Sequence, residues 1–208
     1  MAERLASGRH HLSREEVAAN QKRRLFKALA SVMTASGYST TTVDAVIKEA
    51  KVSRATFYQH FESKQDLFMA GYARMQRHVI DAILTVPVVG TPMERFAVML
   101  DRYLGFIALD PATARLYLLE VYAAGPEAMR RRVELQQEFV AGAALIFGAH
   151  TQEERFACQA LIAAISTLVT NTLTSGDADA VAALRAPILQ YAERVMGSGP
   201  PPMHDGHR

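Results

Sequence analysis

The stretch from Val52 to Leu67 constrains the fold most, because it has room for only a very short helix between two helix starts. Ser53 is typical of an N-cap, since its hydroxyl can accept a hydrogen bond from a free N–H of the first turn. Ser63, followed three residues later by Asp66, begins another helix in the manner of a capping box. The helix between them has under three turns and is not stable alone, so neighbouring helices must pack against it.

This short helix has an apolar side and a polar side. Phe57 and Phe61 lie one turn apart and are expected to face inward. The polar side carries the residue types that contact phosphates and base edges of DNA; they are Arg54, Thr56, Tyr58, His60 and Lys64. The pattern predicts a DNA-recognition helix.

The preceding segment completes a helix-turn-helix. Thr41 is predicted to cap a helix with Asp44 at its third position. The apolar stripe of that helix consists of Val43, Val46, Ile47 and Ala50. Residues 51–52 then form a turn before Ser53 starts the recognition helix. A helix, a short turn and a second short helix are the elements of this motif.

Thr42 to Leu67 resembles the DNA-binding motif of the tetracycline-repressor (TetR) family of transcriptional regulators, through the pattern Ser-x-x-Thr-Phe-Tyr-x-His-Phe-x-x-Lys-x-x-Leu. The resemblance is close over the first quarter to third of the chain, and beyond that it extends only to length and helical layout. It implies a set of DNA-contacting residues: Thr42, Ser53, Arg54, Ala55, Thr56, Tyr58, His60 and Lys64. Within this set Arg54 suits a guanine edge and Ala55 a thymine methyl group, while Lys64 also lies in the first turn of the next helix, where free N–H groups attract anions.

Two positions depart from the family pattern. The turn usually has Gly where this chain has Lys51, because a helix C-terminus often needs a positive φ. A small Ala is usual at Ile47, where the two helices cross. We expect Lys51 to adopt the positive φ at some cost and to be placed for an additional phosphate contact.

Charge is distributed unevenly along the chain, although the net charge is only +2. Up to Asp66 there are eleven Lys and Arg against seven Asp and Glu, and the remainder has twelve against fourteen. All five lysines lie in the N-terminal part. This asymmetry favours a nucleic-acid-binding head on a neutral body.

Composition narrows the location and class of the protein. The apolar runs are short and interrupted, so no membrane span is expected. The first residues lack an apolar signal core. Cys158 is the only cysteine, which suits a reducing compartment and a cytoplasmic protein. Cofactors and metal sites are not expected, because no ligand cluster is evident.

Helical periodicity recurs throughout, and strand alternation does not, so the predicted fold is all-α with about nine helices. We expect a flexible arm at 1–12, a helix-turn-helix domain at 13–62, a helical ligand-binding and dimerisation domain at 63–196 and a disordered tail at 197–208. A long fourth helix is the expected link between the two domains. Pro187 is expected to kink the last helix.

The body offers two candidate sites. A ligand cavity is expected among helices four to seven, lined by Met75, His78, Met99, Tyr103, Phe106, Tyr117, Glu120, Tyr122 and Phe139. Met and aromatic residues at helical spacing are equally typical of a core, and Glu120 has the alternative of pairing with Arg115. The last two helices are so apolar that they must be buried on more than one side, within one chain or between two. The resemblance implies a homodimer, with interface residues Ala160, Ala164, Leu168, Leu184, Ile188 and Tyr191.

The function that the resemblance implies is a homodimeric repressor, released from a near-palindromic operator by a small-molecule ligand. Enzymatic activity is not expected, because the sequence lacks a nucleophile–base set, a metal constellation and a phosphate-cradling glycine loop. Two alternatives remain open: an all-helical small-molecule carrier, and a module that binds protein instead of DNA.

Overall fold

The computed structural model describes residues 13–84, 89–175 and 179–197, and all of its elements there are helices. The predicted all-α fold is confirmed. The expected arm at 1–12 and nearly all of the expected tail lie outside the described residues.

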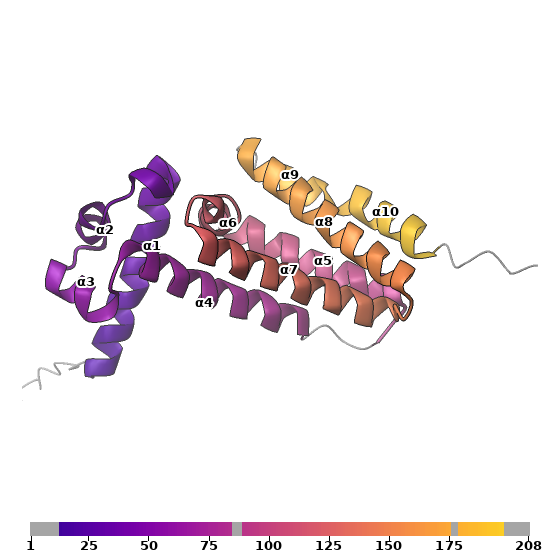
Figure 1. Cartoon of the computed structure of the whole chain (residues 1–208), viewed down its shortest axis with the longest axis horizontal. Coiled ribbons are helices and arrows are strands. Elements are labelled where there is room, and N and C mark those ends of the chain that lie inside the picture. Colours follow the sequence, from indigo (N-terminus) through magenta and orange to yellow (C-terminus); the bar gives the residue numbers. More distant parts are fainter. Residues whose placement is uncertain (1–12, 85–88, 176–178, 198–208) are drawn as a thin grey trace, which may run out of the picture.

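Three helices and the start of a fourth make up the head: α1 (Arg14–Thr40), α2 (Val43–Ala50), α3 (Arg54–His60) and α4 (Lys64–Leu84). From the head, α4 runs along the body (Figure 1). The body continues with α5 (Pro92–Leu109), α6 (Pro111–Leu118), a 3-10 turn η1 (Glu120–Tyr122), α7 (Pro126–Phe147), α8 (Gln152–Ser175), α9 (Asp179–Ala183) and α10 (Arg185–Gly197). In Figure 1, α8, α9 and α10 lie on the side of the body opposite α4.

Side-chain caps begin several of the helices, and one of them differs from the sequence prediction. Capping boxes begin α1 at Ser13 and α5 at Thr91, and Asp110 caps α6. The predicted cap of α2 at Thr41 is wrong by one residue, since the hydroxyl of Thr42 accepts from the N–H of Ala45. Thr41 is instead buried, and its hydroxyl donates to the carbonyl of Gly37 at 2.7 Å. Because of this inward bond, Thr41 closes the end of α1.

Gly37 ends the regular part of α1. Its φ of 77° and ψ of 166° interrupt the helix before a last turn at 38–40. A positive φ costs a glycine little, because it has no Cβ.

One apolar core joins the head to the body. Leu25, Leu29 and Phe57 of the head pack in the same cluster as Leu67 and Phe68 of α4. That cluster continues through Tyr72 and Met75 to Tyr117, Val121 and Leu135 in the body. A second cluster fills the body between α5, α7, α8, α9 and α10. A movement of α4 therefore displaces side chains in both parts.

Helix α6 packs closely on α4 at Gly71. A Cβ at this glycine would overlap the hydroxyl of Tyr117. The absent side chain is what allows Tyr117 to lie across α4.

The last helical segment differs from the expected kink at Pro187. The chain breaks at Leu184, so that Pro187 falls in the first turn of α10. A proline ring clashes with the carbonyl four residues before it, and the first turn is where its missing N–H costs least.

Candidate nucleic-acid interface and ligand cavity

The turn between α2 and α3 is closed by a lysine in the left-handed conformation. Lys51 has φ 52° and ψ 47°, and its N–H bonds back to the carbonyls of Ile47 and Lys48. Its own carbonyl accepts from Nη2 of Arg24 at 2.6 Å. Lys51 thus adopts the conformation for which glycine is preferred, as expected, and α1 supports the turn.

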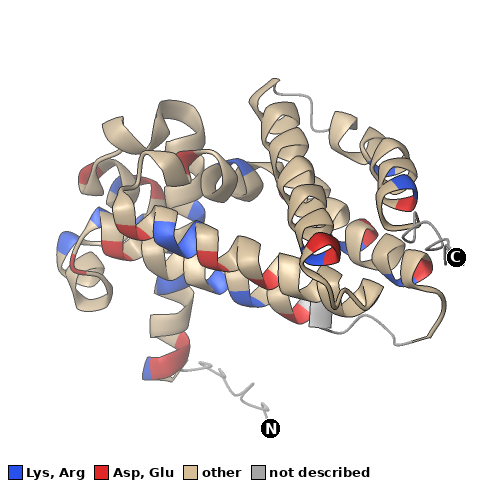
Figure 2. Ribbon diagram, turned by 45° about the vertical axis from the view of Figure 1, so that its right-hand side comes forward, with Lys and Arg blue, Asp and Glu red and all other residues tan. Residues whose placement is uncertain are grey.

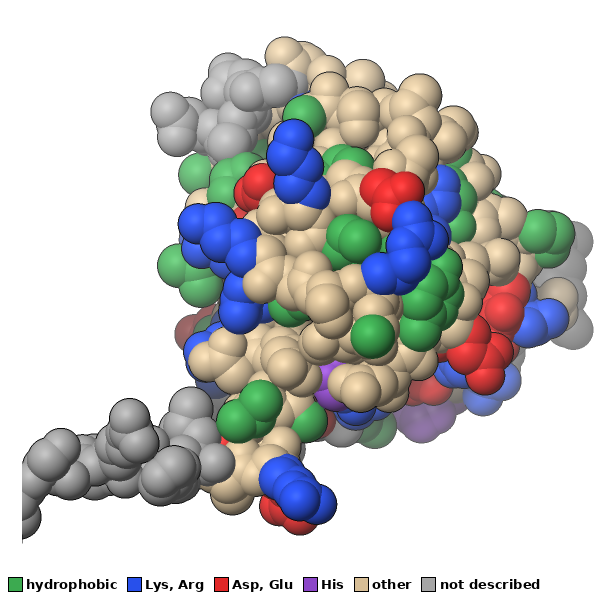
Figure 3. Space-filling view, turned by 90° about the vertical axis from the view of Figure 1, so that its left-hand side faces the viewer, with side chains coloured by type: hydrophobic (Ala, Val, Ile, Leu, Met, Phe, Trp, Pro, Cys, Tyr) green, Lys and Arg blue, Asp and Glu red, His purple; other side chains and the backbone are tan. Residues whose placement is uncertain are grey.

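Helix α3 is anchored from beneath and exposed above. Phe57 is fully buried and Phe61 nearly so, while Arg54 and Ala55 are exposed and Tyr58 keeps 50% of its surface. Ser53 caps the helix by accepting from the N–H of Thr56 at 3.0 Å. The polar face predicted from the sequence is therefore accessible, and Lys and Arg side chains stand out from this end of the molecule (Figure 3).

Arg54 has a partner within the head. Its guanidinium forms an ion pair with Asp44 of α2, and both side chains are more than half exposed. Exposed ion pairs contribute about 0–1 kcal/mol, so this pair can open to let Arg54 reach a base.

His60 and Lys64 are tied to α1 and the turn that follows it. His60 Nε2 lies 2.8 Å from Oε1 of Gln21. The ammonium of Lys64 donates to the carbonyls of Tyr38 and Thr41 at 2.6 and 2.8 Å, and lies 4.1 Å from the centre of the Tyr38 ring. Burial lowers the pKa of Lys64. Of the expected phosphate contacts, these two therefore also hold the head together.

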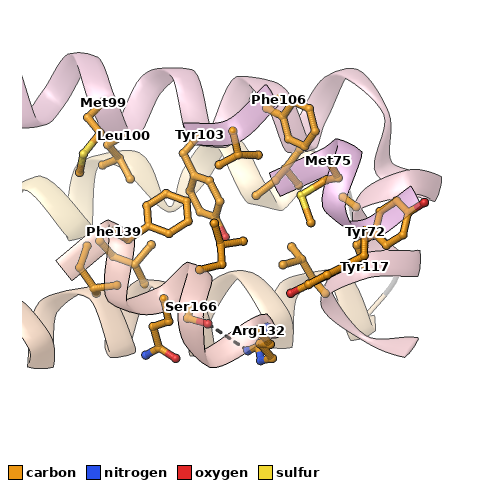
Figure 4. A pocket seen from close by; sticks show the side chains of 18 residues that line it. Tyr72, Met75, Met99, Leu100, Tyr103, Phe106, Tyr117, Arg132, Phe139 and Ser166 are labelled. Carbon is orange, nitrogen blue, oxygen red and sulfur yellow. Dashed lines mark hydrogen bonds between the residues drawn. The ribbon is translucent and has the colours of Figure 1, made fainter. Parts of the chain in front are cut away.

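A cavity of about 70 Å³ lies in the body between α4, α5, α6, α7 and α8 (Figure 4). Six of the nine predicted ligand residues line it: Met75, Met99, Tyr103, Phe106, Tyr117 and Phe139. Its wall is otherwise mainly aliphatic. Geometry thus groups these six residues around one space, and their role in binding stays a prediction.

The other three predicted ligand residues do not line this cavity. His78 is exposed on the outer face of α4. The side chain of Tyr122 is 55% exposed to solvent and does not line the cavity. Glu120 points toward the head, where Oε2 accepts from the N–H of Tyr38 at 2.7 Å. It does not pair with Arg115, which donates to the carbonyl of Leu173. Helical periodicity placed these residues near the cavity but did not determine which way each faces.

Sequence reasoning missed four polar residues of the wall: Tyr72, Arg132, Gln136 and Ser166. Tyr72, Arg132 and Ser166 come from α4, α7 and α8, and Arg132 Nη2 donates to Ser166 Oγ at 3.1 Å (Figure 4). Burial raises the pKa of Tyr72 to about 12 and that of Tyr103 to about 12, and the charge of Arg132 opposes both shifts. No local signal separated Arg132 from the adjacent Arg130 and Arg131, because only the packing of α7 turns it inward.

The predicted interface residues lie on helices that leave apolar surface uncovered. Leu168 and Tyr191 retain 42% and 44% of their surface. Ala160, Ala164 and Leu184 are partly buried, whereas Ile188 is buried within the chain at 3%. Ile188 therefore belongs to the core of the body and not to the exposed surface of α10.

Helix α8 is long and apolar enough to cross a membrane by length and composition, contrary to the expectation of interrupted apolar runs. It carries charge only in its first turns and is tan over the rest of its length in Figure 2. One third of its most apolar window is buried inside the chain. The inward side of α8 belongs to the core of the body. Its apolar residues on the outer side, such as Leu168, are exposed to solvent in the single chain.

Residues 25–70 match the family model described as bacterial regulatory proteins, tetR family. No curated protein matches the chain. Among solved structures, the fatty acid degradation regulator FadR from Bacillus halodurans is 20% identical, with a TM-score of 0.74 over 86% of this chain and 95% of that one. A TetR-like transcriptional regulator from Rhodococcus sp. RHA1 is 20% identical, with a TM-score of 0.71 over 91% and 100%. FadR from Bacillus subtilis, in complex with stearoyl-CoA, is 18% identical, with a TM-score of 0.70 over 81% and 95%.

The structure thus combines a helix-turn-helix head with a helical body that encloses a cavity. The chain has the fold of the TetR-family transcriptional regulators, and its helix-turn-helix lies within the residues that match the tetR family model.

Proposed function

We propose that the protein is a homodimeric repressor, which binds a near-palindromic operator through α3 and leaves it when an apolar small molecule occupies the body cavity. The observation that carries this proposal is the continuity of α4. Its first turns share an apolar cluster with Phe57 of the recognition helix, and its later residues Tyr72, Met75 and Val79 line the cavity.

The exposed face of α3 supports DNA contact. Arg54, Ala55 and Tyr58 project from a helix whose opposite side is fixed by Phe57. Such a helix presents its first residues to base edges in the major groove, while the surrounding polar groups hold phosphates.

The uncovered surface of α8 and α10 supports a dimer. Leu168 and Tyr191 are large, exposed and on neighbouring helices of the body. Pairing of this surface with its twofold mate would remove it from water. It would also hold two heads for half-sites about 34 Å apart, one helical turn of DNA.

The size of the cavity supports a switch. Ligand pockets enclose about 300–1,000 Å³, and this cavity encloses about 70 Å³. A ligand must therefore push the walls apart, and α4 is one of those walls. The similar regulator from Bacillus subtilis was solved with stearoyl-CoA, which supports a ligand with an apolar chain. Ligand binding that favours the displaced α4 shifts the spacing of the heads, with a coupling of typically about 1–3 kcal/mol.

The test is operator binding by the full chain, measured by fluorescence anisotropy on the DNA flanking its gene at several salt concentrations. We expect tight, sequence-preferring binding that weakens steeply with salt, because phosphate contacts release counterions. Tyr58→Ala should weaken binding about five- to tenfold, as expected for one lost hydrogen bond of about 1 kcal/mol. Tyr122→Ala, which removes a similarly exposed tyrosine from the body, is the matched control.

Weak binding that is equal on random DNA and unchanged by Tyr58→Ala would contradict the proposal. The carrier and the protein-binding module would then be the better hypotheses.

A further inference from the structure

The wall of the cavity is mainly apolar, and apart from tyrosines its polar side chains are Arg132, Gln136 and Ser166. Arg132 of α7 is half-buried there, with its Nη2 3.1 Å from Ser166 Oγ. Its guanidinium carbon lies 5.0 Å from the centre of the Tyr122 ring. The long sides are formed instead by aliphatic, methionine and phenylalanine side chains (Figure 4).

A buried hydroxyl at the same cavity has no partner. Tyr72 is 1% exposed, and its hydroxyl makes no hydrogen bond within the described residues. An unpaired buried polar group costs about 1–3 kcal/mol, so a ligand atom that accepts this O–H would relieve a cost already present. The raised pKa of Tyr72, to about 12, keeps the hydroxyl protonated and able to donate.

The charge of the wall has a single sign. Among the lining residues Arg132 is the one charged side chain, and none is an aspartate or glutamate. A guanidinium has five N–H donors in a fixed fork that matches a carboxylate. A cationic ligand would meet an unopposed positive charge here, whereas an anionic group would be paired.

We propose that the cavity binds an amphipathic anion, with its apolar chain between α4, α5 and α7 and its anionic head on Arg132, Ser166 and Tyr72. This inference rests on the proposed ligand-released function and names the class of the ligand. Met75 and Met99 line the chain site, and their flexible side chains can yield as the cavity opens. A free carboxylate and a coenzyme A thioester both offer an apolar chain with anionic chemistry at one end, so the experiment must separate them.

The experiment is isothermal titration calorimetry of the full chain, which measures its affinity for decanoate, decanoyl-coenzyme A, decanol and decyltrimethylammonium. We expect decanoate or its thioester to bind at least about tenfold more tightly than decanol, the gain of about one charge-assisted hydrogen bond. The cationic amphiphile should not bind. Whichever anion binds more tightly identifies the source of the head group.

Three variants test the assignment of the head. Arg132→Gln should lower the affinity for the anionic probe about tenfold and leave decanol unchanged, and Tyr72→Phe should produce a smaller loss for the anion alone. Arg130→Gln, on the outer face of the same helix, should leave both affinities unchanged. Circular dichroism spectra that match the wild type establish that the variants fold.

Equal affinity for decanoate, its thioester and decanol, or equal effects of Arg132→Gln and Arg130→Gln, would overturn the assignment. Operator binding is measured on the same preparations without ligand. If operator binding is intact and no anion binds, only the ligand class is wrong. If the anion binds as expected but the operator is not recognised, the ligand class holds and the proposed repressor function fails.

Discussion

The geometry of Lys64 favours a role in stabilising the head over contact with a DNA phosphate. Its ammonium donates to the carbonyls of Tyr38 and Thr41 at the end of α1, where helix carbonyls lack the regular partner four residues on. Charge-assisted hydrogen bonds of this kind contribute about 1.5–3 kcal/mol. Lys64 is therefore a brace between α4 and α1, and phosphate contact is at most an added role.

We predict that Lys64→Met lowers the free energy of unfolding by about 2 kcal/mol, the contribution of one such charged hydrogen bond. Urea unfolding followed by circular dichroism measures it. Lys48→Met, at an exposed position in α2, is the control. If Lys64 acts only within the fold, the substitution leaves the salt dependence of operator binding unchanged. If Lys64 contacts a phosphate, the slope of log affinity against log salt concentration falls by about 1.

Lys51 adopts a positive φ of 52°, which is unfavourable for a residue with a side chain. A residue with a Cβ is less stable than glycine at positive φ, by about 1–2 kcal/mol before the larger chain entropy of glycine is subtracted. We predict that Lys51→Gly raises the free energy of unfolding by about 0.5–1 kcal/mol. Lys48→Gly, in the helical part of α2, should lower it by about the same amount. Two changes of the same sign in thermal denaturation would show that φ does not decide the effect.

At the scale of elements, one side of α8 is buried in the body and the other side is exposed. Cys158, Leu161, Ile165 and Val169 turn into the body and are buried, while Leu168 faces away and stays accessible. The spacing of three to four residues on the buried side is that of one helical face. The accessible side mixes two large apolar side chains, Phe156 and Leu168, with polar residues such as Gln159 and Asn171.

We predict that Leu168→Glu converts the protein from dimer to monomer at micromolar concentration, because a charge at the centre of an apolar interface is left unpaired. Sedimentation velocity measures the change. Leu109→Glu, at the exposed end of α5, carries the same substitution away from this surface and should remain dimeric. Dimers that persist in Leu168→Glu would place the interface elsewhere.

At the scale of the whole molecule, Glu120 joins parts of the chain that are far apart in sequence. Its carboxylate accepts from the N–H of Tyr38, the residue after the Gly37 break, at a separation of 82 positions. Tyr117 and Leu118, just before Glu120, line the cavity. The contact thus connects residues beside the cavity to the head through a hydrogen bond that does not involve α4.

We predict that Glu120→Ala reduces the effect of ligand on operator affinity about fivefold, equivalent to about 1 kcal/mol of coupling. Glu120→Gln should behave like the wild type, since its amide oxygen still accepts from the backbone N–H. Operator affinity with and without saturating ligand measures both. The same ligand effect in all three proteins would show that α4 alone transmits the change.

Local chemistry determined most of the head. Ser13, Ser53, Ser63 and Thr91 cap helices because their hydroxyls satisfy N–H groups only a few residues away. The helical fold follows from the same short-range rules, and the positive φ of Lys51 was implied by the family pattern, which usually has Gly at that position. The motif of α2 and α3 was predictable for this reason, and the one-residue error at Thr41 arose where two hydroxyls compete for the same cap.

Tertiary packing decided the direction of side chains in the body. Periodicity shows that a helix has an apolar side, but it does not show which neighbour that side meets. Arg132 faces the cavity, Glu120 faces the head and Ile188 faces the core because α7, η1 and α10 are held by helices distant in sequence. The sequence alone therefore determined that this chain is all-helical with a TetR-type helix-turn-helix, whereas the polar end of its cavity exists only where the folded chain brings α4, α7 and α8 together.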